Sequence, residues 1–125
     1  MKEELNVQKS LCKWLKLQYP SLVFFSDMSG LKTTIGVAVQ MKALRSGNAI
    51  PDLFIACPAN GKAGLFLEIK RDVAAVWRKD GTLRKNEHVA EQFAMLMYLR
   101  DLGYAAEFGY GLDDCISKVK NYFSN

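Results

Sequence analysis

Two acidic residues interrupt apolar segments near the middle of the chain, and a lysine follows the second at a spacing of two. Asp52 stands in AIPDLFIAC, and Glu68 with Lys70 stands in GLFLEIKRD. Both segments have the length and apolar content of buried strands, where an unpaired carboxylate is costly. Lys70 could balance Glu68, or a divalent cation could be shared by Asp52 and Glu68. A structural salt bridge at the end of a sheet is the alternative explanation of this Glu-x-Lys pattern.

The second of these strands should be covered on both faces. Its alternation of two places Leu65, Leu67 and Ile69 on one side and Phe66, Glu68 and Lys70 on the other, with large apolar residues on each. If Asp52 and Glu68 pair directly across the hairpin, an odd number of residues must separate the paired positions. A two-residue turn at Asn60-Gly61 would instead bring Asp52 opposite Ile69. We therefore expect an odd-membered turn or a bulge.

A third acid is expected on the first helix, residues 3 to 18, which ends at the Tyr19-Pro20 step. At 100° per residue, Glu4 and Gln8 fall within its apolar arc, which contains Val7, Leu11, Trp14, Leu15 and Gln18. Glu3 lies at the edge of that arc, so Glu4 is the preferred functional acid and Glu3 the fallback. The alternative role for Glu4 is a favourable charge in the first turn of a helix.

A long helix from residue 86 to about 102 carries another polar intrusion. Gln92 sits near the centre of its apolar face, which consists of Val89, Met95, Leu96, Leu99 and Leu102. A buried amide needs hydrogen-bond partners at both ends. His88, one turn earlier, has either a capping or surface role or an accessory role at the site.

Polar residues on the apolar faces of separate elements are expected to meet in one pocket. The set is Glu4, Gln8, Asp52, Glu68, Lys70 and Gln92. Carboxylate oxygens with few nitrogen ligands and no thiolate cluster suit a hard ion, Mg²⁺ or Mn²⁺, which takes its remaining ligands from water and substrate phosphates. This chemistry indicates phosphodiester hydrolysis.

The remaining pattern predicts an α/β fold, a mixed central sheet flanked by helices, in the order α-β-α-β-β-α-β-α. The other expected elements are a strand over 22–28, a helix over 35–46 capped by Thr33 or Thr34 and closed by Gly47, strands over 52–57, 64–70 and 105–110, a turn at Lys79-Asp80-Gly81, and a last helix opened by Asp113 or Asp114. A chain of 125 residues fits one domain, residues 1–125.

Composition narrows the class of protein. The start MKEELNVQKS lacks a signal-peptide core, and no stretch approaches about 18 apolar residues, so we expect no membrane association. Three widely spaced cysteines indicate neither a disulfide framework nor a thiolate metal site. The expected location is therefore a reducing cytoplasm, in a bacterial or phage-infected cell. A net charge of +4 favours polyanionic partners only weakly.

Basic residues gather after the proposed site. Next to Lys70 they are Arg71, Arg78, Lys79, Arg84 and Lys85. They could follow a DNA backbone or belong to a solvated loop. Trp77 in the same segment could stack on a base or anchor the loop.

The ordered set of these residues resembles the PD-(D/E)XK nuclease superfamily, and within it the small VRR-NUC (virus-type replication-repair nuclease) domain. The resemblance rests on Glu4 with Gln8, Pro51-Asp52, Glu68-Ile69-Lys70, and Gln92 before a leucine-rich helix that ends at Gly103. It implies a restriction-endonuclease-like core in which Asp52, Glu68 and the Ile69 carbonyl bind the metal. Glu4 would contribute directly or through water, Lys70 would orient or deprotonate the attacking water, and Gln92 and Gln8 would be accessory residues. The long basic segment 71–86 departs from the family pattern.

The resemblance implies a metal-dependent endodeoxyribonuclease, with a branched substrate such as a Holliday junction or a flap, acting in replication, recombination or repair. A chain of this length has little room to read bases, so we expect recognition of DNA shape. Symmetric cutting of two strands would need two copies, which predicts a homodimer. The alternative is a nucleic-acid-binding or assembly module that keeps the fold but does not cut.

Overall fold

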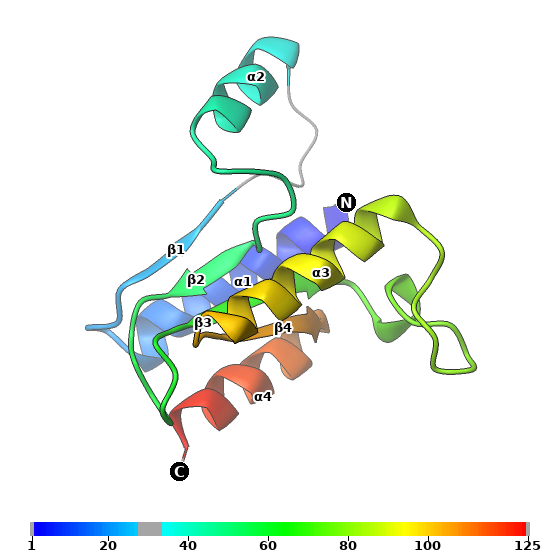
Figure 1. Ribbon diagram of the computed structural model, residues 1–125. Coiled ribbons are helices and arrows are strands. Elements are labelled where there is room, and N and C mark those ends of the chain that lie inside the picture. Colours follow the sequence, from blue (N-terminus) through cyan, green and yellow to red (C-terminus); the bar gives the residue numbers. More distant parts are fainter. Residues whose placement is uncertain (1, 28–33, 125) are drawn as a thin grey trace.

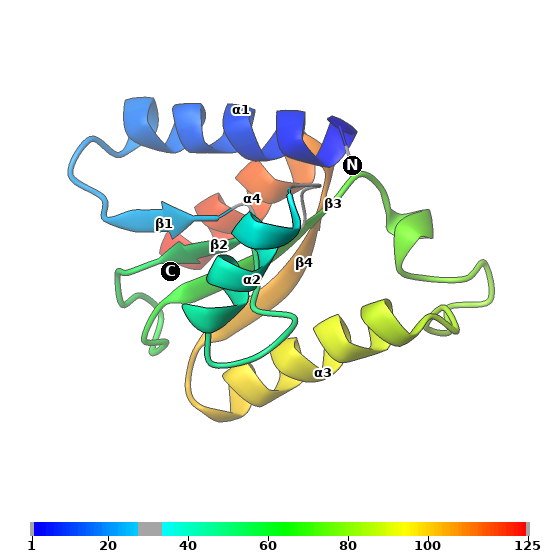
Figure 2. The same ribbon diagram turned by 90° about the horizontal axis from the view of Figure 1, so that it is seen from above.

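A mixed four-stranded sheet lies between helices (Figures 1 and 2). A computed structural model describes residues 2–27 and 34–124. Its elements are α1 (Lys2–Gln18), β1 (Phe24–Ser26), α2 (Ile35–Ala43), β2 (Leu53–Ile55), β3 (Leu65–Lys70), the short 3-10 helix η1 (Val73–Ala75), α3 (Glu87–Asp101), β4 (Ala105–Tyr110) and α4 (Gly111–Phe123). The strand order is β1-β2-β3-β4, antiparallel except between β3 and β4. The expected α/β class with a mixed, helix-flanked sheet is confirmed.

Strand β3 is the centre of two separate apolar clusters, as its alternation predicts. Leu65, Leu67 and Ile69 pack with α1 and α4, whereas Phe66 packs with α3 and β4. Leu11 and Leu15 of α1 are fully buried in the first cluster, and each such leucine stabilises the fold by about 1.5–3 kcal/mol. Polar residues on β3 therefore belong to a rigid strand that is covered on both faces.

The α3 face follows the prediction except at its end. Val89, Leu96 and Leu99 are buried against the second cluster. Leu102, predicted on the same face, is 55% exposed because α3 ends at Asp101 and the chain turns away.

The β2–β3 hairpin contains the predicted bulge. Asn60 and Gly61 adopt positive φ angles of 50° and 76° in a two-residue turn flanked by the Ala59–Lys62 bridge. Ile55 nevertheless pairs with Leu65, so residues 56–58 lie opposite residues 63–64 and one extra residue is absorbed on the β2 side. The nine residues 56–64 thus form an odd-membered connection.

Helix α2 projects from the rest of the chain (Figure 1) and contains no buried residue. The Thr34 hydroxyl accepts a hydrogen bond from the Val37 N–H at 3.2 Å, so the predicted cap is confirmed. Thr33, the alternative cap, and Met28, near the predicted end of the first strand, lie outside the described residues.

The end of α2 was predicted wrongly. The helix ends at Ala43, three residues before Ser46. Gly47 does not close it with a left-handed conformation; the positive φ in this connection belongs to Ala49, at 63°. The predicted helix was too long because the apolar Leu44 extends the sequence pattern, but Leu44 lies beyond the helix and is exposed.

The start of α4 also differs from the prediction. Gly111, with a φ of 81° at the end of β4, begins the helix, so neither Asp113 nor Asp114 opens it. Asp114 instead reaches back from inside the first turn, and its carboxylate accepts a hydrogen bond from the Tyr110 N–H at 2.9 Å.

Two cationic side chains cover the outer edge of β4. Arg100 Nε donates to the Ala106 carbonyl at 2.8 Å, and Lys118 Nζ donates to the Phe108 carbonyl at 2.6 Å. These carbonyls face away from β3, where no further strand of the described sheet lies.

The segment between β3 and α3 folds back on itself. The predicted turn is present, since the Gly81 N–H donates to the Arg78 carbonyl at 2.9 Å and Trp77 bridges to Leu83.

In the described part of the chain, no helix is long and apolar enough to cross a membrane.

Candidate active site

Asp52, directly before β2, lies next to Glu68 of β3 at the same level of the sheet. Leu53 pairs with Leu67, so the next position in the same register brings Asp52 opposite Glu68, as predicted. The Asp52 carboxylate accepts a hydrogen bond from the Ile69 N–H at 2.8 Å. The two acidic side chains also act on each other, since the negative charge of Asp52 raises the pKa of Glu68.

Burial raises the pKa of both acids. For Asp52, the neighbouring Glu68 and the hydrogen bond from the Ile69 N–H act against the rise in pKa. The pKa of Glu68 lies well above its ordinary value, first because the group is buried and then because Asp52 is negative, while Lys70 acts in the opposite direction. A cation bound between the two acids would act against this rise, because it would favour their charged forms.

Glu4 adds to this negative field from α1. It is partly buried, whereas Glu3 is exposed, and its charge contributes to the raised pKa of both Asp52 and Glu68. Among the described residues, however, no group of three or more acidic, histidine or cysteine side chains has a metal-binding arrangement. The structure thus brings Glu4 near the pair without completing a three-acid cluster.

Gln8 supports the site from behind. Its amide Nε2 donates to Ser26 Oγ at 2.7 Å and to the Asp27 carbonyl at 2.6 Å. Ser26 Oγ in turn donates to the Asp52 carbonyl at 2.7 Å. This chain of hydrogen bonds ties α1 and β1 to the backbone that carries the Asp52 carboxylate.

Lys70 is 8% exposed and lies two residues beyond Glu68, on the same face of β3. The positive charge of Lys70 acts to lower the pKa of Glu68. Lys70 is not among the described residues that line the neighbouring cavity. Its neighbour in β4 is Tyr110.

Gln92 reaches the same region from α3, as its place on the apolar face predicts. It is 5% exposed, and its Nε2 lies 3.1 Å from His88 Nε2. Its Oε1 atom is buried and has no hydrogen-bond partner within the described structure. His88 is exposed and does not cap α3, since Asn86 does so by accepting from the Val89 N–H.

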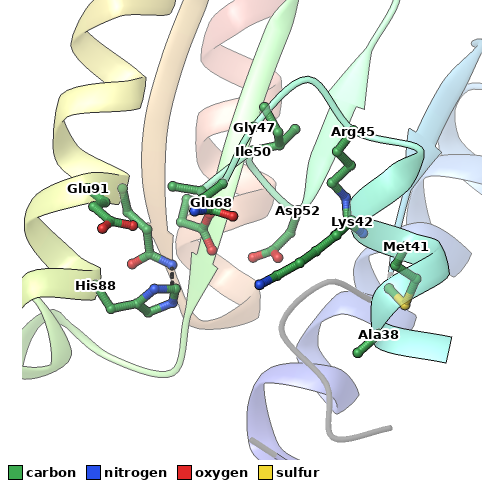
Figure 3. Close-up of a pocket in the computed structure, with 13 residues that line it drawn as sticks. Ala38, Met41, Lys42, Arg45, Gly47, Ile50, Asp52, Glu68, His88 and Glu91 are labelled. Carbon is green, nitrogen blue, oxygen red and sulfur yellow. Dashed lines mark hydrogen bonds between the residues drawn. The ribbon is translucent and has the colours of Figure 1, made fainter. Parts of the chain in front are cut away.

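Of the residues expected to share one pocket, Asp52, Glu68 and Gln92 line a cavity of about 460 Å³, within the range of ligand-binding clefts (Figure 3). Glu4, Gln8 and Lys70 are not among its lining residues. Asp52 and Glu68 lie between two walls, one from α3 and one from α2 with the connection that follows it. The lining residues are Ala38, Met41, Lys42, Arg45, Gly47, Asn48, Ala49, Ile50, Asp52, Glu68, His88, Glu91 and Gln92. Sequence analysis missed the α2 wall, because nothing local in that segment shows that it folds over the acids.

The basic segment after β3 is mostly open to solvent. Arg71, Arg78, Lys79, Arg84 and Lys85 are exposed. Arg71 forms a weak 3.7 Å ion pair with Asp72, and Arg84 Nε donates to the Ala74 carbonyl.

Trp77 anchors this basic segment. Its Nε1 donates to the Tyr110 hydroxyl at 2.7 Å, and its ring meets Phe93 edge to face at 5.9 Å. The structure thus favours the anchoring role over base stacking.

The fold and the acid pair together define a class: a small α/β domain with a mixed sheet and a polar cleft. One solved structure with this architecture, described as a VRR_NUC domain protein, has a TM-score of 0.64 to this chain, covering 96% of it and 87% of the other chain. The sequence identity is 22%. No protein-family model matches the sequence, and no curated protein matches it significantly. The chain therefore has the fold of a VRR_NUC domain protein, as the resemblance implied.

Proposed function

We propose that this protein is a metal-dependent endodeoxyribonuclease with a PD-(D/E)XK core. The Asp52–Glu68 pair is the main support, because the chain holds two neighbouring acids with raised pKa values in a cavity, at a cost that a cation would remove. The likeness to a VRR_NUC domain protein adds support for a nuclease-type domain.

The donor atoms suit Mg²⁺ or Mn²⁺. Asp52 and Glu68 offer carboxylate oxygens, the Ile69 carbonyl is adjacent in sequence, and no described histidine or cysteine cluster competes. Glu4 fits a contribution through water, because it does not form a three-acid cluster with the pair. When bound, the ion would polarise the scissile phosphate and lower the pKa of a coordinated water.

The protein's own residues would supply the remaining roles. Lys70 would orient the attacking water and offset negative charge that develops on the phosphorane. The unpaired Gln92 Oε1 would accept a hydrogen bond from a water or a substrate group in the cavity. Gln8 would hold the Asp52 backbone in position through Ser26.

The proposed substrate is DNA, which the protein would recognise by its shape through contacts to the backbone and not to the bases. The exposed basic residues after β3 would follow the phosphate backbone. The DNA substrate would be branched, such as a Holliday junction or a flap. A homodimer would cut two of its strands. Light scattering that showed only monomer at micromolar concentration would contradict paired cutting.

Incubation with supercoiled, linear and four-way-junction DNA tests the activity, in Mg²⁺, in Mn²⁺ and in chelator. We expect nicking that depends on the metal and falls at least about 100-fold in Asp52→Ala. Cleavage that persists in chelator and in the variant would indicate a contaminant and refute the proposal. Binding to DNA without cleavage under every condition would favour a non-catalytic module.

A further inference from the structure

Helix α2 has an inner face that meets the cavity and not the core. Ala38, Met41 and Lys42 line the cavity from one stripe of the helix, and Arg45 lines it from just beyond the helix end. The helix buries nothing, and its apolar residues Ile35, Val39 and Leu44 are exposed. Its placement over Asp52 and Glu68 therefore does not come from core packing.

The α2 wall carries two cations, and the structure assigns them different tasks. Arg45 is neutralised, because its guanidinium contacts Asp27 at 2.9 Å and is only 19% exposed. This ion pair also ties the end of α2 to the end of β1 and so fixes the wall in place.

Lys42 is different, since no ion pair involves it in residues 2–27 and 34–124. Figure 3 shows its side chain extending from α2 across the cavity toward Asp52. A free ammonium group thus faces two acids across a cavity of about 460 Å³. A cationic and an acidic wall together suit an anion that arrives with its own cation, such as a phosphodiester with a divalent metal.

We propose that Lys42 binds a phosphate oxygen of the DNA strand in the cavity, so that the strand lies between α2 and α3. This proposal rests on the proposed nuclease function. Lys42 acts from the solvent side, whereas Lys70 acts from within β3 and is not among the cavity-lining residues. Loss of Lys42 removes one phosphate contact, so the salt dependence of DNA binding should become shallower by about 0.7–0.9 in the slope of log K against log[salt].

Labelled duplex and four-way-junction DNA, titrated in Ca²⁺ at several salt concentrations, test the contact apart from cleavage. We expect Lys42→Ala to bind about tenfold more weakly, as for loss of a charged hydrogen bond, and Lys42→Arg to restore most of the affinity. Lys120→Ala is the matched control, because Lys120 is exposed on α4, on the opposite face of the sheet, and its loss changes the net charge equally. Thermal unfolding should be unchanged, since α2 has no buried residue.

Three outcomes separate this proposal from the proposed nuclease function. If the wild type cleaves DNA and Lys42→Ala matches it in affinity, salt slope and KM, the contact is refuted and the nuclease stands. If the wild type binds but never cleaves and the salt slope still falls in Lys42→Ala, the phosphate contact stands and the nuclease fails. If Lys42 only balances the acids, its loss steepens the fall of stability with pH and leaves the salt slope unchanged, which overturns the proposal.

Discussion

Replacing Glu68 by glutamine should make the metal-free protein more stable at alkaline pH. Folded Glu68 keeps its proton above the ordinary glutamic acid pKa of 4.5 because burial and Asp52 raise its pKa. The unfolded chain loses that proton near pH 4.5, so the folded state binds more protons above this pH. The free energy of unfolding of the wild type must therefore fall as pH rises, until the pH passes the folded pKa.

The size of the effect follows from the linkage relation. One proton of difference between the folded and unfolded states corresponds to about 1.4 kcal/mol per pH unit. Asp52, whose pKa is also raised, adds to this slope. The Glu68→Gln side chain cannot ionise, so the variant loses the Glu68 contribution to the slope and becomes the more stable protein at pH 8.

Urea denaturation in EDTA between pH 5 and 9 measures the slope, with Asp101→Asn as a control because Asp101 is exposed at the end of α3. Mg²⁺ added at pH 8 should stabilise the wild type, by about 2.7 kcal/mol at 100 times its Kd. It should stabilise Glu68→Gln much less. Parallel pH profiles for wild type and Glu68→Gln would refute the reasoning, since they would show that Glu68 ionises normally in the fold.

Three further outcomes are expected. Gly64→Ala should cost about 1–3 kcal/mol in urea denaturation, because its Cβ would lie 2.8 Å from the Ile55 carbonyl oxygen, whereas Gly47→Ala should cost little, having no atom within 4 Å. Gln92→Leu should raise thermal stability or leave it unchanged while lowering cleavage, because it removes a buried oxygen without a partner; a large loss of stability would contradict this. Lys70→Ala should reduce cleavage about 100-fold or more but leave DNA binding in Ca²⁺ nearly intact, and an equal loss of both would argue against its proposed role.

The sequence predicts features that depend on local residue patterns, and on whether an odd or an even number of residues connects two strands. The two faces of β3 follow from its alternation. Direct pairing of Asp52 with Glu68 requires an odd-membered turn or a bulge, and the connection contains the bulge. Gln92 is buried because its helical position leaves no other side for it to face.

Long-range placement was not predictable in the same way. Lys42 belongs to an exposed helix with no buried residue, and Arg45 follows the end of that helix, so no periodicity indicates which partners they meet. The role of Asp114 was missed for a related reason, because the chain enters α4 directly from β4 through Gly111 and the capping carboxylate reaches backward.

The cationic cover on the outer edge of β4 limits how copies of this protein can associate. A second chain could extend the sheet there only by displacing Arg100 from Ala106 and Lys118 from Phe108. Fibril-like addition of strands is disfavoured at this edge for the same reason. Any association that extends the sheet would therefore have to use its other edge, β1.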